Sequence, residues 1–143
     1  MARPEPWQLL PESYPFSHLT ETRFADLDLL GHINNVSMAG LFEHGRGMFN
    51  HSIAAQRRTE GQRWLIAAVD INYIAEAHFP QPVRIASGIS RIGNSSWDIA
   101  SAAFQDGECK ATCLTTIVLT EASGSVPISD DLRREFERLG ITR

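Results

Sequence analysis

The sequence predicts an α+β fold in a single domain spanning residues 1–143, with one central helix followed by a run of antiparallel strands. Apolar residues recur at helical spacing between positions 36 and 53. The second half of the chain alternates apolar and polar residues in long segments separated by turn sequences. A length of 143 residues is that of one ordinary domain, and 43% hydrophobic with 21% charged residues is typical of a soluble globular protein.

The N-terminal segment, residues 1–15, carries four of the seven prolines. We expect an extended arm that Trp7 and Tyr14 attach to the body of the domain. Residues 16–24 are rich in threonine and aromatic side chains, which favours a first strand.

Between Val36 and about Ile53, one broad side of the expected helix is apolar and the opposite side holds mostly small residues. Such a helix has little polar surface, so we expect it to be enclosed. Gly40, Gly45 and Gly47 each cost about 1 kcal/mol in a helix interior relative to alanine. Close approach of a sheet or a ligand is expected to offset that cost.

After a polar loop, four strands are expected at residues 64–77, 83–92, 96–104 and 109–120. Short turn sequences join the last three strands, which predicts an antiparallel meander. Ser129 is expected to cap a short C-terminal helix that Gly140 ends.

The composition excludes several classes of protein. The formal charge of −4 comes from interspersed acids and bases, so no nucleic-acid partner is expected. No apolar run approaches 18 residues and no signal peptide is recognisable, so no membrane association is expected. Cys109 and Cys113 should point to the same face of one strand with Cα atoms about 13 Å apart, too far for a disulfide. Unbridged cysteines are typical of a cytoplasmic protein.

The residues most suggestive of chemistry lie between Arg23 and Asn35, where an extended segment turns through Gly31 into the helix. They are Asp26, Asp28, His32, Asn34 and Asn35. A carboxylate, an imidazole and the free N–H groups of a helix start are the groups that attack or polarise a carbonyl. From these residues alone, Asp28 is as well explained by a turn or cap as by catalysis.

This stretch resembles the hotdog-fold acyl-CoA thioesterases of the 4-hydroxybenzoyl-CoA thioesterase family. The matching residues are Asp26-Leu27-Asp28-Leu29-Leu30-Gly31-His32-Ile33-Asn34-Asn35, then Phe42-Glu43, Arg46, Asp70-Ile71-Asn72-Tyr73, Pro80, Arg91 to Ser96 and Asp106-Gly107. The resemblance implies a long antiparallel sheet wrapped around one central helix. It also implies hydrolysis of an acyl-CoA to the free acid and coenzyme A, with no cofactor beyond the coenzyme A of the substrate. A homodimer or homotetramer with sites at the subunit interface is implied as well.

Residue by residue, Asp28 matches the family's essential carboxylate, as nucleophile or general base. The backbone N–H near Asn35 matches the group that polarises the thioester carbonyl. His32 matches a histidine of the plant acyl-carrier-protein thioesterases, but Leu30 replaces its asparagine companion, so His32 is expected to be a helper. Met38 stands where the family often has a tyrosine, at the acyl pocket.

The other candidates each have a functional and a structural interpretation. Asp26 is expected to fix the loop, and Asn34 and Asn35 to cap the helix. Glu43 either holds the loop or a water molecule, or pairs with Arg46 three residues later.

Four arginines are candidates for binding the phosphates of coenzyme A: Arg57, Arg58, Arg63 and Arg91. Asn94, Ser95 and Ser96 resemble a segment that borders the pantetheine arm, and alternatively form a tight hairpin. A metal site from Asp28, His32, Glu43 and His44 lacks an established ligand motif, so no metal is expected.

Two other functions stay open. One is a hydratase or dehydratase that acts on an acyl thioester on the same fold, and the other is an acyl-CoA-binding protein without turnover. The acyl group, the choice between coenzyme A and an acyl carrier protein, and the choice between dimer and tetramer are also open at this stage.

Overall fold

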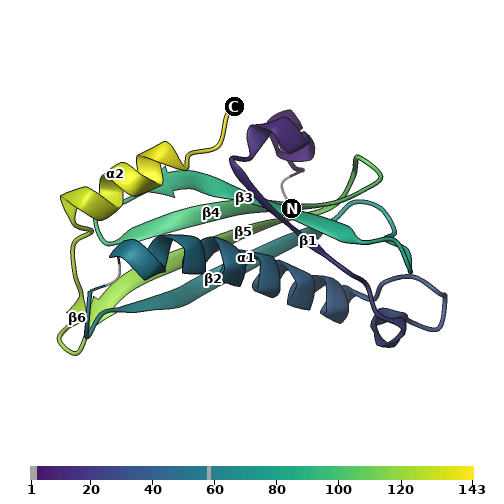
Figure 1. Ribbon diagram of the computed structural model, residues 1–143, viewed down its shortest axis with the longest axis horizontal. Coiled ribbons are helices and arrows are strands. Elements are labelled where there is room, and N and C mark those ends of the chain that lie inside the picture. The colour runs from purple at the N-terminus through teal and green to yellow at the C-terminus, as the bar shows by residue number, and fades with distance from the viewer. Residues whose placement is uncertain (1–2, 58) are drawn as a thin grey trace.

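The computed structural model describes residues 3–57 and 59–143, and five strands of this part form one antiparallel sheet curled around a long helix (Figure 1). The strands are β1 (Phe16–Thr20), β2 (Arg63–Tyr73), β3 (Val83–Ile92), β4 (Ser96–Gln105) and β5 (Glu108–Glu121), with a short β6 (Gly124–Ser125) paired to β5. The helices are α1 (Asn35–Arg57) and α2 (Asp130–Arg138). The strand order is β1-β3-β4-β5-β2. The predicted hotdog fold and the β3-β4-β5 meander are confirmed.

Two predicted strands end earlier than expected, for local reasons. The first stops at Thr20, and Phe24–Asp26 forms a short 3₁₀ helix instead. β2 stops at Tyr73 because the N–H groups of Ile74 and Ala75 both donate to the Lys110 carbonyl and leave the ladder. Neither described helix has the length and apolar character needed to cross a membrane.

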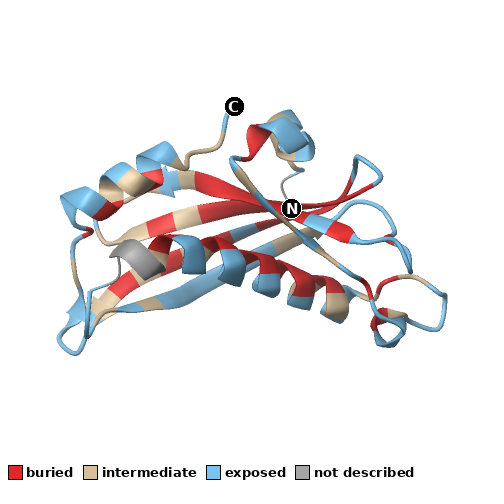
Figure 2. Ribbon diagram, in the orientation of Figure 1, coloured by how far each residue is buried: buried red, intermediate tan, exposed pale blue. Residues whose placement is uncertain are grey.

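The sheet covers one side of α1 rather than enclosing it. The inner side buries Met38, Phe42, Phe49 and Ile53 against the sheet. Pale blue stretches of α1 in Figure 2 mark its outer side, where the residue Val36 is 82% exposed. Enclosure by this chain alone was therefore a wrong expectation, and the small residues of the outer side remain exposed.

The helix glycines differ in role. A Cβ built at Gly45 would lie 2.6 Å from Ile85 Cβ on β3, closer than real Cβ contacts come. Gly40 and Gly47 have nothing within 4 Å of a built Cβ. Close approach of the sheet therefore explains Gly45 alone, and it sets how deeply α1 sits in the curl.

A β-bulge interrupts the alternation of β5. Ala103 pairs with Ala111 and Phe104 pairs with Cys109, so Lys110 is the extra residue. Cys109 consequently packs with Phe104 on the face away from α1, whereas Cys113 packs on the α1 side. The two cysteines are free, as expected, but they point to opposite faces, which corrects the prediction from regular alternation.

The N-terminal arm is not extended throughout. Pro6–Leu9 and Pro11–Ser13 form two short 3₁₀ helices that lie on the face of the sheet away from α1. The Trp7 ring is tilted against Tyr14 with centroids 6.3 Å apart, and Tyr14 meets Phe104 edge to face at the same centroid distance. These two aromatic residues hold the segment on the sheet.

The helix α2 packs at the end of the curled sheet that holds the C-terminal half of α1. Ser129 Oγ accepts from the Leu132 N–H at 3.2 Å, which confirms the predicted cap. Phe136 of α2 packs at 4.7 Å from Trp97, with Trp64 at 5.0 Å from the same ring. This aromatic cluster lies beside the C-terminal half of α1.

Gly45→Ala is expected to reduce the free energy of unfolding by about 1–3 kcal/mol, because the new methyl group overpacks against the β-branched Ile85. Gly47→Ala is the matched control. It should cause no loss, since its side chain meets open space and alanine favours the helix. Urea titrations followed by circular dichroism measure both. Equal stability of the two variants would rule out the Gly45 contact as the constraint on helix depth.

Candidate active site at the α1 N-terminus

The loop before α1 is folded around the Asp28 carboxylate. Asp28 Oδ1 accepts from the backbone N–H groups of Leu30 at 2.9 Å and His32 at 3.1 Å. The Asp28 N–H donates to the His32 carbonyl at 2.9 Å, and Gly31 adopts φ +81°, which glycine alone adopts without strain. One carboxylate oxygen thus fixes the turn, while the side chain stays exposed with Oδ2 available to a reactant.

Asp26 anchors the same loop from the interior. Its side chain is buried and receives hydrogen bonds from the Arg23 N–H at 2.9 Å and the Arg23 guanidinium at 2.8 Å. Burial raises the pKa of Asp26, but the hydrogen bonds and charge of Arg23, with the Ser37 hydroxyl, outweigh it and hold that pKa below its usual value. Asp26 is therefore a loop anchor, as the sequence suggested.

The start of α1 is capped by Asn34. Its Oδ1 accepts from the Ser37 N–H at 2.7 Å, and its carbonyl accepts from the Met38 N–H at 2.9 Å. Within the part of the chain that the structure describes, the N–H groups of Asn35 and Val36 have no acceptor. Two backbone donors at the positive end of the helix dipole are thus available for an anion or a polarised carbonyl oxygen.

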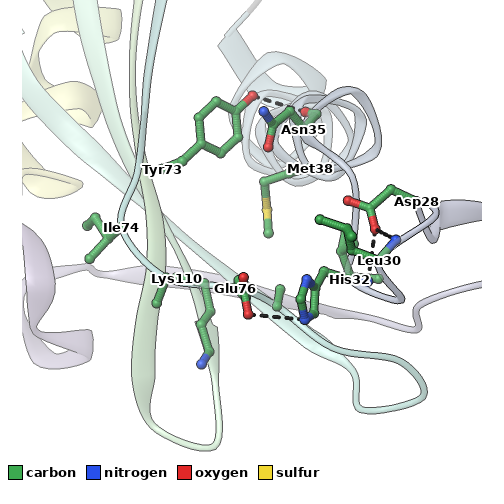
Figure 3. A pocket seen from close by; sticks show the side chains of 12 residues that line it. Asp28, Leu30, His32, Asn35, Met38, Tyr73, Ile74, Glu76 and Lys110 are labelled. Carbon is green, nitrogen blue, oxygen red and sulfur yellow. Dashed lines mark hydrogen bonds and ion pairs between the residues drawn. The ribbon is translucent and has the colours of Figure 1, made fainter.

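A pocket of about 320 Å³ opens between this helix start, the Asp28 loop and the end of β2 (Figure 3). Asp28, His32, Asn35 and Met38 line it, so the structure brings four predicted residues together. Met38 projects into its centre. The Tyr73 hydroxyl donates to the Asn35 carbonyl at 3.0 Å and ties the helix start to β2.

Among the polar lining residues, three were not predicted as site residues from the sequence: Tyr73, Glu76 and Lys110. Glu76 Oε2 lies 3.1 Å from His32 Nε2. The loop that carries Glu76 is fastened because the Ile33 N–H donates to the Ala77 carbonyl at 2.9 Å. Tyr73 and Glu76 flank the end of a strand that matched the family weakly, which was the only available signal. Lys110 had none, since its placement depends on the bulge.

Other predicted residues lie away from the pocket. Glu43 is exposed on the outer side of α1 and does not line the pocket. Its suggested partner Arg46 is buried and donates to Thr115 Oγ1 at 3.1 Å. No Glu43–Arg46 ion pair occurs among the described residues.

The predicted coenzyme A segment lies at the other end of the sheet. Arg91 Nε contacts Asp98 Oδ2 at 2.8 Å, and the Gly93 N–H donates to the Ser96 carbonyl at 2.7 Å. The segment from Arg91 to Ser96, which includes Asn94 and Ser95, is therefore a tight hairpin. The length of β3, about 30 Å, separates this hairpin from the pocket.

Arg63 begins β2 at that same end. Arg58 and the side chain of Arg57 lie outside the described residues. The described residues contain no cluster of three or more His, Cys, Asp or Glu side chains able to hold a metal ion.

Comparison with known proteins adds independent findings. Residues 22–136 match the model of the Thioesterase-like superfamily. A thioesterase from Thermus thermophilus, solved with coenzyme A and Zn, is 25% identical with a TM-score of 0.79, covering 90% of this chain and 96% of its own. A predicted thioesterase from Bacillus stearothermophilus is 27% identical with a TM-score of 0.78, covering 87% and 96%. A Pseudomonas aeruginosa protein is 26% identical with a TM-score of 0.76, covering 93% and 96%. No curated protein matches the chain.

Asp26→Asn is expected to lower the free energy of unfolding at neutral pH by about 1–3 kcal/mol, because charged hydrogen bonds to Arg23 are lost. The pKa of Asp26 is lowered in the folded chain. Its contribution is therefore complete above about pH 4, the ordinary aspartate value, and is lost as the pH falls through the lower folded value.

Urea titrations across the acidic range measure this dependence. Asp106→Asn, in an exposed turn, is the matched control and should keep the wild-type pH profile of stability. An Asp26→Asn profile parallel to that of the wild type would contradict the anchoring role.

Proposed function

The chain belongs to the thioesterase-like superfamily, and from that premise we propose that it is an acyl-CoA thioesterase that releases a free acid and coenzyme A. The observation that carries the proposal is the pocket in which the Asp28 carboxylate meets the open N-terminus of α1. Within the superfamily, the residues from Asp26 to Asn35 favour the 4-hydroxybenzoyl-CoA thioesterase type. Coenzyme A enters as part of the substrate, and the proposed reaction uses no other cofactor.

The proposed chemistry begins with the thioester carbonyl oxygen at the N–H groups of Asn35 and Val36. Negative charge develops on this oxygen when the carbonyl carbon is attacked, and the two donors with the helix dipole stabilise it. Both donors are already fixed by the Asn34 cap and by the Tyr73 hydroxyl on the Asn35 carbonyl. The site therefore needs little reorganisation during the reaction.

Asp28 promotes attack on the carbonyl carbon by one of two routes. As a nucleophile, Oδ2 bonds to the carbonyl carbon, the C–S electron pair leaves with the thiolate, and water then hydrolyses the mixed anhydride and restores the carboxylate. As a general base, the carboxylate takes a proton from water while the water oxygen bonds to the carbon, and the same thiolate leaves. In both routes the thiolate ends protonated as the coenzyme A thiol.

His32 is a helper in this proposal. Its Nε2 faces Glu76, and its other ring nitrogen points away from that carboxylate (Figure 3). A carboxylate beside one imidazole nitrogen fixes the ring orientation and favours Nε2–H, which leaves Nδ1 to accept a hydrogen bond from water. Glu76 can therefore orient the His32 ring in this chain, although Leu30 stands where the plant acyl-carrier-protein thioesterases have an asparagine.

We also propose that the working site needs a second copy of the chain. β2 is an edge strand, and Leu65, Ile66 and Val69 on it are each about half exposed. Antiparallel pairing of two β2 strands about a two-fold axis sets the Tyr73 end of one copy beside the Arg63 end of the other. The hairpin from Arg91 to Ser96, which we propose binds coenzyme A, lies at the Arg63 end of the sheet. In such a dimer it approaches the pocket of the partner. The cytoplasm is the expected location.

Asp28→Asn is expected to slow thiol release by about 10²- to 10⁴-fold, because the neutral amide neither attacks the carbonyl nor takes a proton from water. A thiol reagent measures release from a panel of short, medium, long and aromatic acyl-CoAs. Asp106→Asn is the charge-matched control and should keep the wild-type rate. Wild-type release by Asp28→Asn would remove the assigned mechanism.

The same panel separates the alternative functions. An absorbance change of an enoyl-CoA without thiol release would identify a hydratase or dehydratase. Tight binding without any turnover would identify an acyl-CoA-binding protein.

Val69→Lys is expected to convert the dimer to monomers, because the two introduced ammonium groups meet near the two-fold axis. The monomer should also lose thiol release, since its pocket lacks the partner's hairpin. Light scattering measures the mass. Leu114→Lys, on the neighbouring strand β5, is the control and should remain dimeric and active. An active Val69→Lys monomer would show that one copy suffices.

A further inference from the structure

Lys110 is chemically singular in this chain. Of the thirteen lysine and arginine residues, Lys110 is the one lysine. Its side chain is only 11% exposed and lines the pocket described above. Lysine is among the residues least often buried, so the position of this one requires an explanation.

The β5 bulge is what turns Lys110 toward the pocket. Ala111 lies on the α1 side of the strand, so regular alternation from Ala111 would aim residue 110 away from α1 and residue 109 toward it. Cys109 instead lies on the face away from α1. The extra residue lets Lys110 and Ala111 share one side. The Lys110 carbonyl accepts from Ile74 at 2.9 Å and Ala75 at 3.1 Å, which fixes its backbone beside the Glu76 loop.

The ammonium group is weakly satisfied. Its partner among the described residues is Glu108 Oε1 at 3.6 Å, and the Glu108 side chain is 64% exposed. Exposed pairs at such distances contribute little, and an ammonium group has three donors. The other charged or titratable groups lining the pocket are Asp28, His32, Tyr73 and Glu76. Tyr73 already donates to the Asn35 carbonyl, and Glu76 already contacts His32.

We propose that Lys110 binds an anionic group of the substrate at the side of the pocket opposite Asp28 and Asn35 (Figure 3). This inference rests on the proposed thioesterase function and deepens it. A substrate whose carbonyl sits at the α1 N-terminus would cross Met38 and reach Lys110 with its distal part. An ammonium group in a partly dehydrated pocket favours a carboxylate or phosphate over a methyl group. Lys110 is thus a specificity-determining residue.

Two parts of an acyl-CoA carry such a charge: a carboxylate at the end of the acyl chain and the phosphates of coenzyme A. Four stable thioethers separate them. S-carboxypropyl-CoA and S-isohexyl-CoA have acyl-like ends of equal size, one charged and one neutral. S-carboxypropylpantetheine and S-isohexylpantetheine repeat the comparison without phosphates. Because thioethers are not hydrolysed, calorimetry measures their binding whether or not the protein is a thioesterase.

Lys110→Met is expected to weaken the recognised ligands by about 10- to 100-fold. A loss confined to the two carboxypropyl ligands assigns the anion to the acyl chain, and a loss confined to the two CoA ligands assigns it to the phosphates. Lys110→Arg should restore most of the affinity. The inference is overturned by any of three results. They are an equal loss of affinity for S-isohexylpantetheine, no loss of affinity for any ligand, and no binding of the ligands by the wild-type protein.

Glu108→Gln supplies a test that leaves Lys110 in place. Removing the Glu108 carboxylate leaves the Lys110 ammonium group without its ion-pair partner and removes a negative charge that repels anionic ligands. These ligands should therefore bind more tightly to the variant than to the wild type. Unchanged or weaker binding would count against the proposal. Thiol release from the corresponding thioesters is measured separately. Its absence would refute the proposed hydrolysis, while the thioether affinities would still decide the role of Lys110.

Discussion

The absent side chain at Gly45 is the constraint that positions everything else. Because nothing projects from Gly45 toward Ile85, α1 settles close to β3 and the curl of the sheet closes over its inner side. That depth places the first turn of α1 level with the end of β2, where Tyr73 reaches the Asn35 carbonyl. The pocket exists because this helix start, the end of β2 and the preceding loop converge there.

Two carboxylates two residues apart have opposite environments. Asp26 is buried, hydrogen-bonded on both oxygens and committed to holding the loop. Asp28 is exposed. One of its carboxylate oxygens accepts the hydrogen bonds of the turn, which leaves the other oxygen facing the pocket. The same short segment thus combines a rigid anchor with an exposed carboxylate, and the anchor keeps that carboxylate in register with the helix N-terminus.

The sequence was sufficient where local rules decide the outcome. The alternation over 83–92 coincides with β3, and Ser129 caps α2 as its position suggested. It failed where one residue changes a pattern or where distant segments meet. The bulge at Lys110 reverses the facing of Cys109, and no local signal marks it. Glu76 reaches His32 only because the 74–82 loop folds back on residue 33. The hairpin from Arg91 to Ser96 matched the family, yet the length of the strand keeps it from its own chain's pocket.

The bulge in β5 also bears on how such a protein can evolve. Lys110 pairs with no residue of β4. A substitution there would change the charge of the pocket wall, while the strand pairs on both sides of the bulge do not involve Lys110. If Lys110 has the proposed role, a mutation at position 110 would change ligand preference within the same strand architecture.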